Sequence, residues 1–192
     1  MGWVDKVPRC SPPLYIGGLH ALYQRRDLFD DYHITHIISV LDFDIYEAGH
    51  FSEFKHIHVK IDDDPNEDLL QYFDQSNAFI AGAAKSSSAP GSSPSENAVF
   101  VHCAMGKSRS ATIVCAYLMW KYELNPRQAL NQLCEGRPIC GPNPGFMEQL
   151  GVYYEMLKAK DEEGSRKIYD KWKSGRFRGE PWEWQKRSLG KL

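Results

Sequence analysis

Short apolar runs alternate with longer amphipathic segments along the first hundred residues. Short runs rich in Ile and Val are typical of β-strands, and apolar residues at helical spacing indicate helices. Strands are predicted at residues 14–16, 36–41, 56–61 and 98–101, and helices near 19–32 and 68–84. The third strand alternates cleanly and should be half exposed, whereas the fourth should be buried. Strands separated by helices predict an α/β fold with a mainly parallel central sheet flanked by helices.

The second half of the chain is predicted to be helical. Residues 108–122 carry apolar side chains on nearly every face, as a buried central helix would. Asn125 followed by Pro126 is typical of a helix start and predicts a helix that ends near residue 135. A further helix is predicted over residues 144–159. Its inward-facing residues are expected to be Phe146, Leu150, Tyr153, Tyr154 and Leu157.

Two segments differ in composition from the rest. Residues 85–97 (KSSSAPGSSPSEN) have the composition of a flexible surface insertion. From residue 160 onward the chain is charged and carries tryptophans, which are expected to pack back on the domain because indole rings are costly to leave in water. These tryptophans are Trp172, Trp182 and Trp184. We predict one domain over residues 1–159 and a C-terminal extension over 160–192.

The charge balance separates the same two parts. Residues 1–159 hold 13 Lys and Arg against 19 Asp and Glu, a net charge of −6. Residues 160–192 hold 10 against 6, a net charge of +4. An acidic domain argues against broad nucleic-acid binding and predicts no DNA partner, whereas the basic extension suits an acidic partner.

The five cysteines contain no C-x-x-C pair. This spacing fits neither a disulfide framework nor a zinc site and predicts reduced intracellular thiols. No signal peptide, myristoylation signal or apolar run long enough to cross a bilayer is recognised, so no membrane partner is predicted. The protein is expected in the cytoplasm, in the nucleus or in both.

Residues 102–110 (HCAMGKSRS) lie between the predicted buried strand and the central helix. In such a loop, successive backbone N–H groups point inward and the helix N-terminus adds partial positive charge, which makes an anion site. Gly106 lets the loop turn. Arg109, six residues after Cys103, can grip two phosphate oxygens in bidentate fashion. The residues expected to bind phosphate are Ala104, Met105, Gly106, Lys107, Ser108 and Arg109.

The same field is expected to lower the pKa of Cys103, because a thiolate at a helix N-terminus is stabilised. A thiolate that faces a bound phosphate is placed for in-line attack. That attack gives a phosphocysteine, which water later hydrolyses. Cys103 is therefore the candidate nucleophile of a phosphoric monoester hydrolase that needs no cofactor.

The loop matches the H-C-x-x-G-x-x-R signature of the cysteine-based phosphatases, and its Ser-Arg-Ser ending resembles their dual-specificity branch. Segments 14–18 and 34–40 resemble that branch's opening strands, and 137–138 with 142–150 resemble its last helix. The resemblance covers about residues 12–158. It implies a protein tyrosine phosphatase-like fold with a phosphate-binding loop between the last strand and the central helix.

The resemblance also implies a substrate class and two residue roles. The loop that deepens the pocket of tyrosine-only phosphatases is not recognisable, which implies a shallower cleft open to phosphotyrosine, phosphoserine and phosphothreonine in proteins. His102 is expected to orient the phosphate-binding loop, and Ser110 to offer its hydroxyl to the departing thiolate. No metal is expected, because His56 and His58 have the pattern of surface residues on a strand rather than of metal ligands.

The chemistry needs a general acid, because an alkoxide or phenolate leaves poorly without a proton. An acidic turn at residues 62–64 follows the third predicted strand, and on chemistry alone any of its three aspartates could serve. In related phosphatases the acid stands ten residues before an aromatic residue, and counting back from Phe73 gives Asp63. Asp63 must be protonated while Cys103 is ionised, which predicts a bell-shaped pH profile with its maximum below neutral pH.

Other interpretations remain open. The domain could serve mainly as a binding module for a phosphorylated or acidic partner. Lys107 resembles a loop lysine of lipid phosphatases, but those enzymes carry a second lysine where this chain has Ala104, so phosphoinositide is the weaker substrate. An RNA 5′-triphosphatase of the same superfamily would need a more basic cleft.

Within the dual-specificity branch, the N-terminus and the basic tail most resemble fungal and other eukaryotic members that continue into a cysteine-rich zinc domain. Those members act in assembly of the large ribosomal subunit. No zinc-ligand spacing is present in this chain. A ribosomal partner and a role in ribosome biogenesis are therefore the alternative that this resemblance implies.

Overall fold

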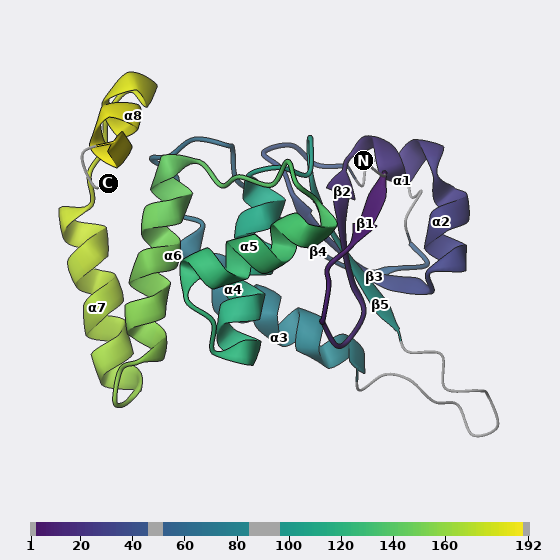
Figure 1. Ribbon diagram of the computed structural model, residues 1–192, viewed down its shortest axis with the longest axis horizontal. Helices are drawn as coiled ribbons and strands as arrows, with labels where there is room; N and C mark the ends of the chain where they lie inside the picture. Colours follow the sequence, from purple (N-terminus) through teal and green to yellow (C-terminus); the bar gives the residue numbers. More distant parts are fainter. Residues whose placement is uncertain (1–2, 46–51, 85–96, 190–192) are drawn as a thin grey trace.

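The computed structural model describes residues 3–45, 52–84 and 97–189. A five-stranded sheet has the order β1-β2-β5-β3-β4, with β5 at its centre. The strands are β1 (Val4–Lys6), β2 (Leu14–Gly18), β3 (Ile34–Val40), β4 (Lys55–Val59) and β5 (Ala98–Cys103). β1 runs antiparallel to β2 and the other neighbouring pairs are parallel, which confirms the predicted mainly parallel sheet (Figure 1).

Four of the strands form where the sequence predicts them. β5 continues two residues beyond its predicted end, through His102 to Cys103, and all its residues are buried because both faces of the sheet are covered. β4 lies at the sheet edge and is mostly partly exposed, as its alternating pattern predicts. β1 was not predicted. It has three residues, two of which are charged, so it gives almost no apolar signal.

Helices flank both faces of the sheet. Two short helices, α1 (His20–Gln24) and α2 (Arg26–Asp31), bury Leu22 and Phe29 in one apolar cluster, which also contains Phe100 of β5. On the other face lies α4, which is buried from Arg109 to Met119 and is packed against three further helices (Figure 1). These four helices are α3 (Phe73–Ala83), α4 (Arg109–Tyr122), α5 (Pro126–Gly136) and α6 (Pro144–Leu157).

The helix boundaries differ from prediction at three places. The predicted helix 19–32 is interrupted at Arg25, whose ψ of 47° is not helical. The predicted helix 68–84 begins later, with a 3-10 turn over Leu70–Tyr72 ahead of α3. Leu157 was predicted to face inward, but it ends α6 at the surface and is 37% exposed. The start of α5 is as predicted, with the Asn125 side chain capping the helix.

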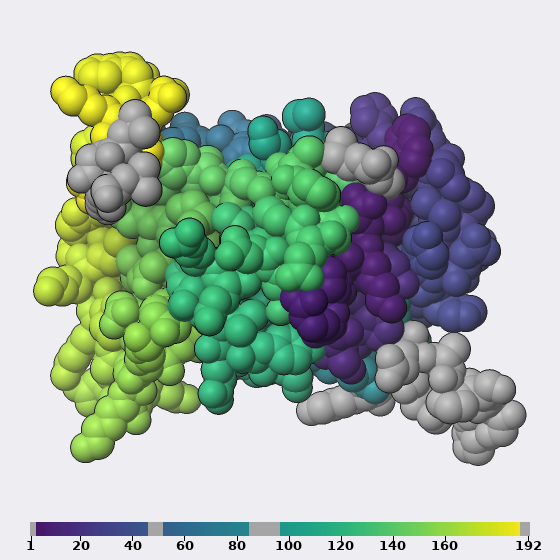
Figure 2. Space-filling model, viewed as in Figure 1, coloured from purple at the N-terminus to yellow at the C-terminus, as the bar shows by residue number. Residues whose placement is uncertain are grey.

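Beyond α6 the chain continues as α7 (Glu162–Gly175) and α8 (Pro181–Leu189), which cover one end of the molecule (Figure 2). Trp172 packs against the main core and Trp184 is 4% exposed, as predicted. The prediction is wrong for Trp182, which is 64% exposed. Residues two apart on a helix point in nearly opposite directions, so α8 buries only one of its two tryptophans.

The predicted insertion at 85–97 lies outside the described residues except for Asn97. The side chain of Asn97 donates a hydrogen bond to the Ala83 carbonyl at 3.2 Å, which ties the start of β5 to the end of α3. Across the described ranges, no helix combines the length and apolar character that a membrane span requires.

Candidate active site

The loop between β5 and α4, residues 104–108, packs tightly on the neighbouring strand. Cys103 is the last residue of β5, and Arg109 is the first of α4. Gly106 has a φ of +67°, and a Cβ at this position would lie 2.2 Å from the Gly17 carbonyl oxygen of β2. Only glycine fits both the backbone conformation and the close contact. The loop is therefore fixed against the end of β2, as the anion-site prediction requires.

A buried arginine holds the loop from its outer side. The Arg137 side chain donates to the carbonyl oxygen of Gly106 at 2.8 Å and to that of Met105 at 3.1 Å. It also forms an ion pair with Asp5 at 2.5 Å. With these carbonyls directed outward to Arg137, the loop's N–H groups can face inward. Arg137 entered the sequence prediction only through the family resemblance, and this contact was not predicted.

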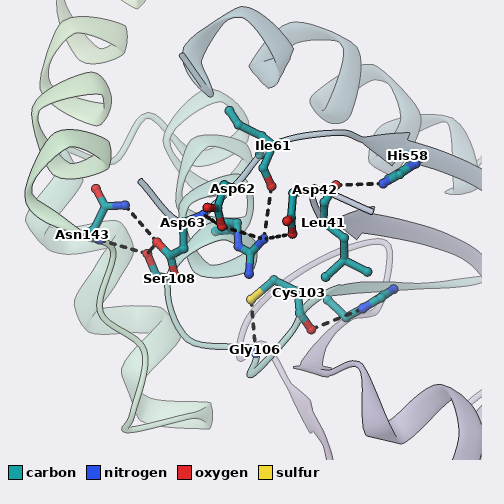
Figure 3. Close-up of polar contacts among 12 residues, drawn as sticks. Leu41, Asp42, His58, Ile61, Asp62, Asp63, Cys103, Gly106, Ser108 and Asn143 are labelled. Carbon is teal, nitrogen blue, oxygen red and sulfur yellow. Dashed lines mark hydrogen bonds and ion pairs between the residues drawn. The ribbon is translucent and has the colours of Figure 1, made fainter. Parts of the chain in front are cut away.

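The Cys103 thiol lies inside the loop, close to several donors (Figure 3). Its sulfur is 3.2 Å from the Gly106 N–H and 3.3 Å from the Ser110 hydroxyl. Burial alone would raise the pKa of Cys103. Hydrogen bonds from Ser110 and from backbone N–H groups, together with the Arg109 charge, outweigh burial, so the pKa lies below its usual value. The structure therefore favours a thiolate, in the direction that the sequence predicts.

The other four cysteines show how specific this environment is. Burial raises the pKa of Cys10 to about 11 and that of Cys140 to about 12. Burial also raises the pKa of Cys115 and of Cys134. Cys103 is the one of the five cysteines at which hydrogen bonds and positive charge outweigh burial, so it is the candidate nucleophile.

Arg109 is buried. One nitrogen of its guanidinium is hydrogen-bonded, and another has no partner among the described residues. Its Nη1 donates to the Ile61 carbonyl at 3.1 Å and to Asp42 at 3.4 Å (Figure 3). Its Nε is buried and has no hydrogen-bond partner among the described residues. A buried guanidinium N–H without a partner is costly unless a ligand supplies one. Arg109 is thus held at one end and has a donor left for an anion.

His102 belongs to a buried chain of hydrogen bonds beneath the loop. Its Nδ1 lies 3.4 Å from the Cys103 carbonyl and its Nε2 lies 2.5 Å from the Ser39 hydroxyl, which is 2.8 Å from His56 Nε2. A carbonyl only accepts, so Nδ1 donates, Nε2 accepts from Ser39, and Ser39 accepts from His56. Burial lowers the pKa of His102 to about 3, so the ring is neutral. This chain fixes the orientation of His102.

The two strand histidines have partners within the sheet. His56 bonds to Ser39, and His58 Nε2 lies 2.9 Å from the carbonyl oxygen of Leu41. Over the residues that the structure describes, no group of three or more His, Cys, Asp or Glu side chains could hold a metal ion.

Asp63 lies against residues 104–108, which we call the phosphate loop. Its Oδ1 accepts hydrogen bonds from the Ser108 hydroxyl at 2.6 Å and from the Asn143 amide at 2.9 Å (Figure 3). The backbone N–H of Asn143 donates in turn to the Ser108 hydroxyl at 3.0 Å. Asn143 also caps α6, where its side chain accepts from Phe146 N–H at 2.9 Å. The start of α6 thus brings Asp63 to the phosphate loop, a contact that the sequence did not predict.

The neighbouring aspartates are placed differently. Asp62 is 65% exposed and lies 3.9 Å from Arg109 Nη1. Asp64 accepts the backbone N–H of Asn66 at 2.7 Å, within its own turn. Asp63 is the one whose carboxylate bonds to a residue of the phosphate loop.

A cavity of about 550 Å³ flanks the outer side of the loop. Its apolar lining includes Trp3, Leu19, Met105 and Ile139, and Met105 is 72% exposed. Lys107 is also exposed, so the loop presents one apolar and one positively charged side chain at the surface.

Comparison with known proteins places the whole arrangement in one family. The family model for the dual specificity phosphatase catalytic domain matches residues 14–156. The tyrosine-protein phosphatase YVH1 of Saccharomyces cerevisiae is 34% identical over 161 residues, which are 79% of this chain and 44% of YVH1. A probable dual specificity protein phosphatase of Dictyostelium discoideum is 36% identical, over 83% of this chain and 37% of the relative. The chain therefore spans less than half the length of either relative.

Solved structures agree with the sequence comparison. The Yvh1 phosphatase domain from Chaetomium thermophilum superposes with a TM-score of 0.70 at 34% identity, over 82% of this chain and 99% of that domain. Human DUSP28 superposes with a TM-score of 0.70 at 27% identity, over 83% of this chain and 97% of the DUSP28 chain. These matches confirm the predicted fold and the predicted resemblance. The chain belongs to the dual specificity phosphatase catalytic-domain family.

Proposed function

We propose that this chain removes phosphate from phosphotyrosine, phosphoserine and phosphothreonine side chains of proteins through a phosphocysteine on Cys103. One observation carries the proposal: a thiol of lowered pKa and a buried arginine N–H without a partner meet in one loop at a helix N-terminus. A phosphate dianion would satisfy both, since it receives hydrogen bonds from Arg109 and presents phosphorus to the sulfur.

The loop is proposed to bind the phosphoryl group through its backbone. The N–H groups of residues 104–109 and the Arg109 guanidinium would surround the non-bridging oxygens. His102 holds the start of the loop, and Arg137 holds its outer side, so the donors are in place before the substrate arrives. Such preorganised donors lower the barrier because little reorganisation is needed during the reaction.

In the first step the Cys103 thiolate attacks phosphorus, an S–P bond forms, and the bond to the substrate oxygen breaks. Asp63 gives its proton to the departing oxygen. Ser108 and Asn143 both donate to Oδ1, which leaves Oδ2 to carry that proton. In the second step Asp63, now ionised, takes a proton from water, which attacks phosphorus and releases inorganic phosphate. The Ser110 hydroxyl stabilises the thiolate that leaves.

The charges around the loop support protein substrates over phosphoinositides. Asp42 and Asp62 are more than half exposed beside Arg109, and Lys107 is the basic side chain that the loop presents to solvent. Negative groups at the mouth favour a phosphorylated segment that also carries basic residues, and they repel a multiply phosphorylated headgroup.

A role in assembly of the large ribosomal subunit is the second candidate. The likeness to YVH1 is the observation that favours it. The basic extension, with a net charge of +4 over residues 160–192, would suit an acidic or ribosomal partner. The location in the cytoplasm, in the nucleus or in both is still a prediction. The division of the chain into a domain over residues 1–159 and an extension over 160–192 is also still a prediction. Co-sedimentation of the chain with large ribosomal subunits would support this role, and its absence from those fractions would contradict it.

The phosphatase proposal is tested by hydrolysis of para-nitrophenyl phosphate under reducing conditions between pH 5 and pH 9. Cys103→Ser should abolish turnover, because a serine hydroxyl is not ionised in this range. The wild type should give a bell-shaped profile with its maximum below neutral pH. Turnover that survives Cys103→Ser would contradict the proposed nucleophile. A folded wild type that does not turn over, but retains a phosphopeptide, would favour the binding module.

A further inference from the structure

The C-terminal helices contact the loop that carries Asp63. We call residues 62–68 the acid loop and residues 160–189 the extension. The family model ends at residue 156, so the extension lies outside it. In Figure 2 the extension covers the end of the molecule next to α6. Its side chains and backbone bond to the acid loop at two places.

The first contact is made by Asn66, three residues after Asp63. The Asn66 amide donates to the Gly179 carbonyl at 3.0 Å, and its side-chain oxygen accepts from the Gly179 N–H at 2.9 Å. The same oxygen accepts from the indole N–H of Trp184 at 3.0 Å. Every described hydrogen bond of the Asn66 side chain is therefore made to the extension, and none is made to another residue of the acid loop.

The partners of Asn66 are themselves fixed. Trp184 is 4% exposed, and its ring meets Phe177 edge-on with centroids 4.9 Å apart. Arg187 of α8 pairs with Glu148 of α6 at 3.1 Å. α8 is therefore anchored to the domain as well as to the acid loop, and it can serve as a support.

The second contact lies at the other end of the acid loop. Asp68 is 5% exposed, and its carboxylate accepts from the Tyr169 hydroxyl at 2.9 Å. Lys173 lies 3.4 Å from the same carboxylate oxygen. Both partners belong to α7. A buried carboxylate needs such partners, so α7 completes the environment of Asp68.

The inner side of the acid loop packs on α6. Gln149 accepts the backbone N–H groups of Leu69 and Leu70 at 2.8 and 2.9 Å and donates to the Glu67 carbonyl at 2.8 Å. A Cβ on Gly145 would lie 2.0 Å from the Pro65 carbonyl oxygen, so the start of α6 lies directly against the loop. The acid loop is thus enclosed between α6 on one side and the extension on the other.

We propose that Asn66 and Trp184 are positioning residues through which the extension holds Asp63 over the phosphate loop. The inference rests on the proposed phosphatase function and assigns to the extension a part in its proton-transfer step. A loop of seven residues has many conformations available, and three hydrogen bonds at its middle remove most of them. A misplacement of a catalytic group by about 1 Å can cost up to about 10²-fold in rate.

The test compares two substrates that differ in their need for an acid. Phenolate leaves poorly without a proton and para-nitrophenolate leaves readily, so phenyl phosphate reports on Asp63 more than para-nitrophenyl phosphate does. The parameter is kcat/KM, which reports the first phosphoryl transfer. The variants are Asn66→Ala and Trp184→Phe, and the matched control is Trp182→Phe, because Trp182 is exposed on the same helix.

Asn66→Ala should lower kcat/KM for phenyl phosphate by about tenfold and that for para-nitrophenyl phosphate by less than about threefold. Trp184→Phe loses one hydrogen bond and should act in the same direction with a smaller effect. Trp182→Phe should match the wild type. Inhibition by inorganic phosphate should not change in any variant, since the phosphate loop is untouched.

Equal losses on both substrates, or losses no larger than those of Trp182→Phe, would overturn the positioning role. Thermal unfolding identifies a variant that has lost its fold, and Trp184→Phe then decides the matter because it keeps most of the ring packing. A wild type inactive on both substrates would instead overturn the phosphatase function, and the positioning role with it. The two failures are therefore distinguishable.

Discussion

The phosphate loop and the acid loop are built in opposite ways. The proposed nucleophile Cys103, the backbone donors of the phosphate loop and Arg109 all lie within residues 102–110, where a strand passes into a helix. The acid loop contributes the exposed carboxylate of Asp63, which Ser108 and Asn143 hold. Asn66 of this loop is bonded to Gly179 and Trp184, which lie 113 and 118 positions further along the chain. The proposed phosphate site is thus built from local sequence, and the proposed proton donor is held by tertiary contacts.

This difference should separate the effects of substitutions. A change in the phosphate loop weakens the stabilisation of every transition state, whatever the leaving group. A change in the acid loop matters only where the leaving group needs a proton.

Arg109→Lys should lower kcat/KM by about 10²- to 10³-fold on phenyl phosphate and para-nitrophenyl phosphate alike. A lysine cannot reproduce the guanidinium, which bonds Ile61 at one end and has Nε left for phosphate. Steady-state kinetics on the two substrates measures the effect. Arg127→Lys, on the exposed side of α5, is the control and should match the wild type. A loss confined to one substrate would contradict the local character of the phosphate loop.

Asp63→Asn should lower kcat/KM about 10²-fold on phenyl phosphate and much less on para-nitrophenyl phosphate. An amide keeps the contacts of Oδ1 but has no acidic proton to give. The fall in rate at higher pH should also disappear, because that limb reports loss of the proton from the acid. Asp64→Asn is the control, since its oxygen can still accept the Asn66 N–H. If Asp64→Asn gave the larger selective loss, the acid would be Asp64.

Ser110→Ala should have the smallest effect on kcat/KM. Its effect should be seen instead in the pH profile. Ser110 lowers the pKa of Cys103, so its removal raises that pKa and moves the acidic limb of the profile to higher pH. A hydrogen bond to a charged group is stronger than one between neutral groups, so the loss of this bond should shift the profile measurably. Alkylation of the thiol by iodoacetamide as a function of pH measures this pKa without turnover. An unchanged alkylation profile would show that Ser110 does not stabilise the thiolate.

Prediction from sequence succeeded where the signal was local. Four strands, the buried central helix and the Asn125 cap follow from spacing that is visible within a few residues. The same is true of the loop between β5 and α4. β1 was missed because a three-residue strand with charged residues has no periodicity to detect. Its partner contact, Asp5 with Arg137, joins residues 132 positions apart and could not be expected from either segment.

The choice of the acid marks the limit of sequence reasoning. Chemistry alone left three adjacent aspartates open, and the family register favoured Asp63. The structure adds the physical difference between them: Asp63 reaches Ser108 and Asn143, Asp62 lies toward Arg109, and Asp64 serves its own turn. This difference depends on where α6 begins relative to the acid loop, which no local pattern encodes.

From the sequence alone came the class of fold, the family, and the candidate nucleophile with its proposed anion-binding loop. These follow from residues close together in the chain, because a strand, a tight turn and a helix N-terminus create their own field. Tertiary structure alone decided how Arg137 supports the loop, how Ser39 orients His102 and how Asn66 joins the extension. Those contacts depend on the packing of distant elements, and packing is set by the whole core rather than by any one segment.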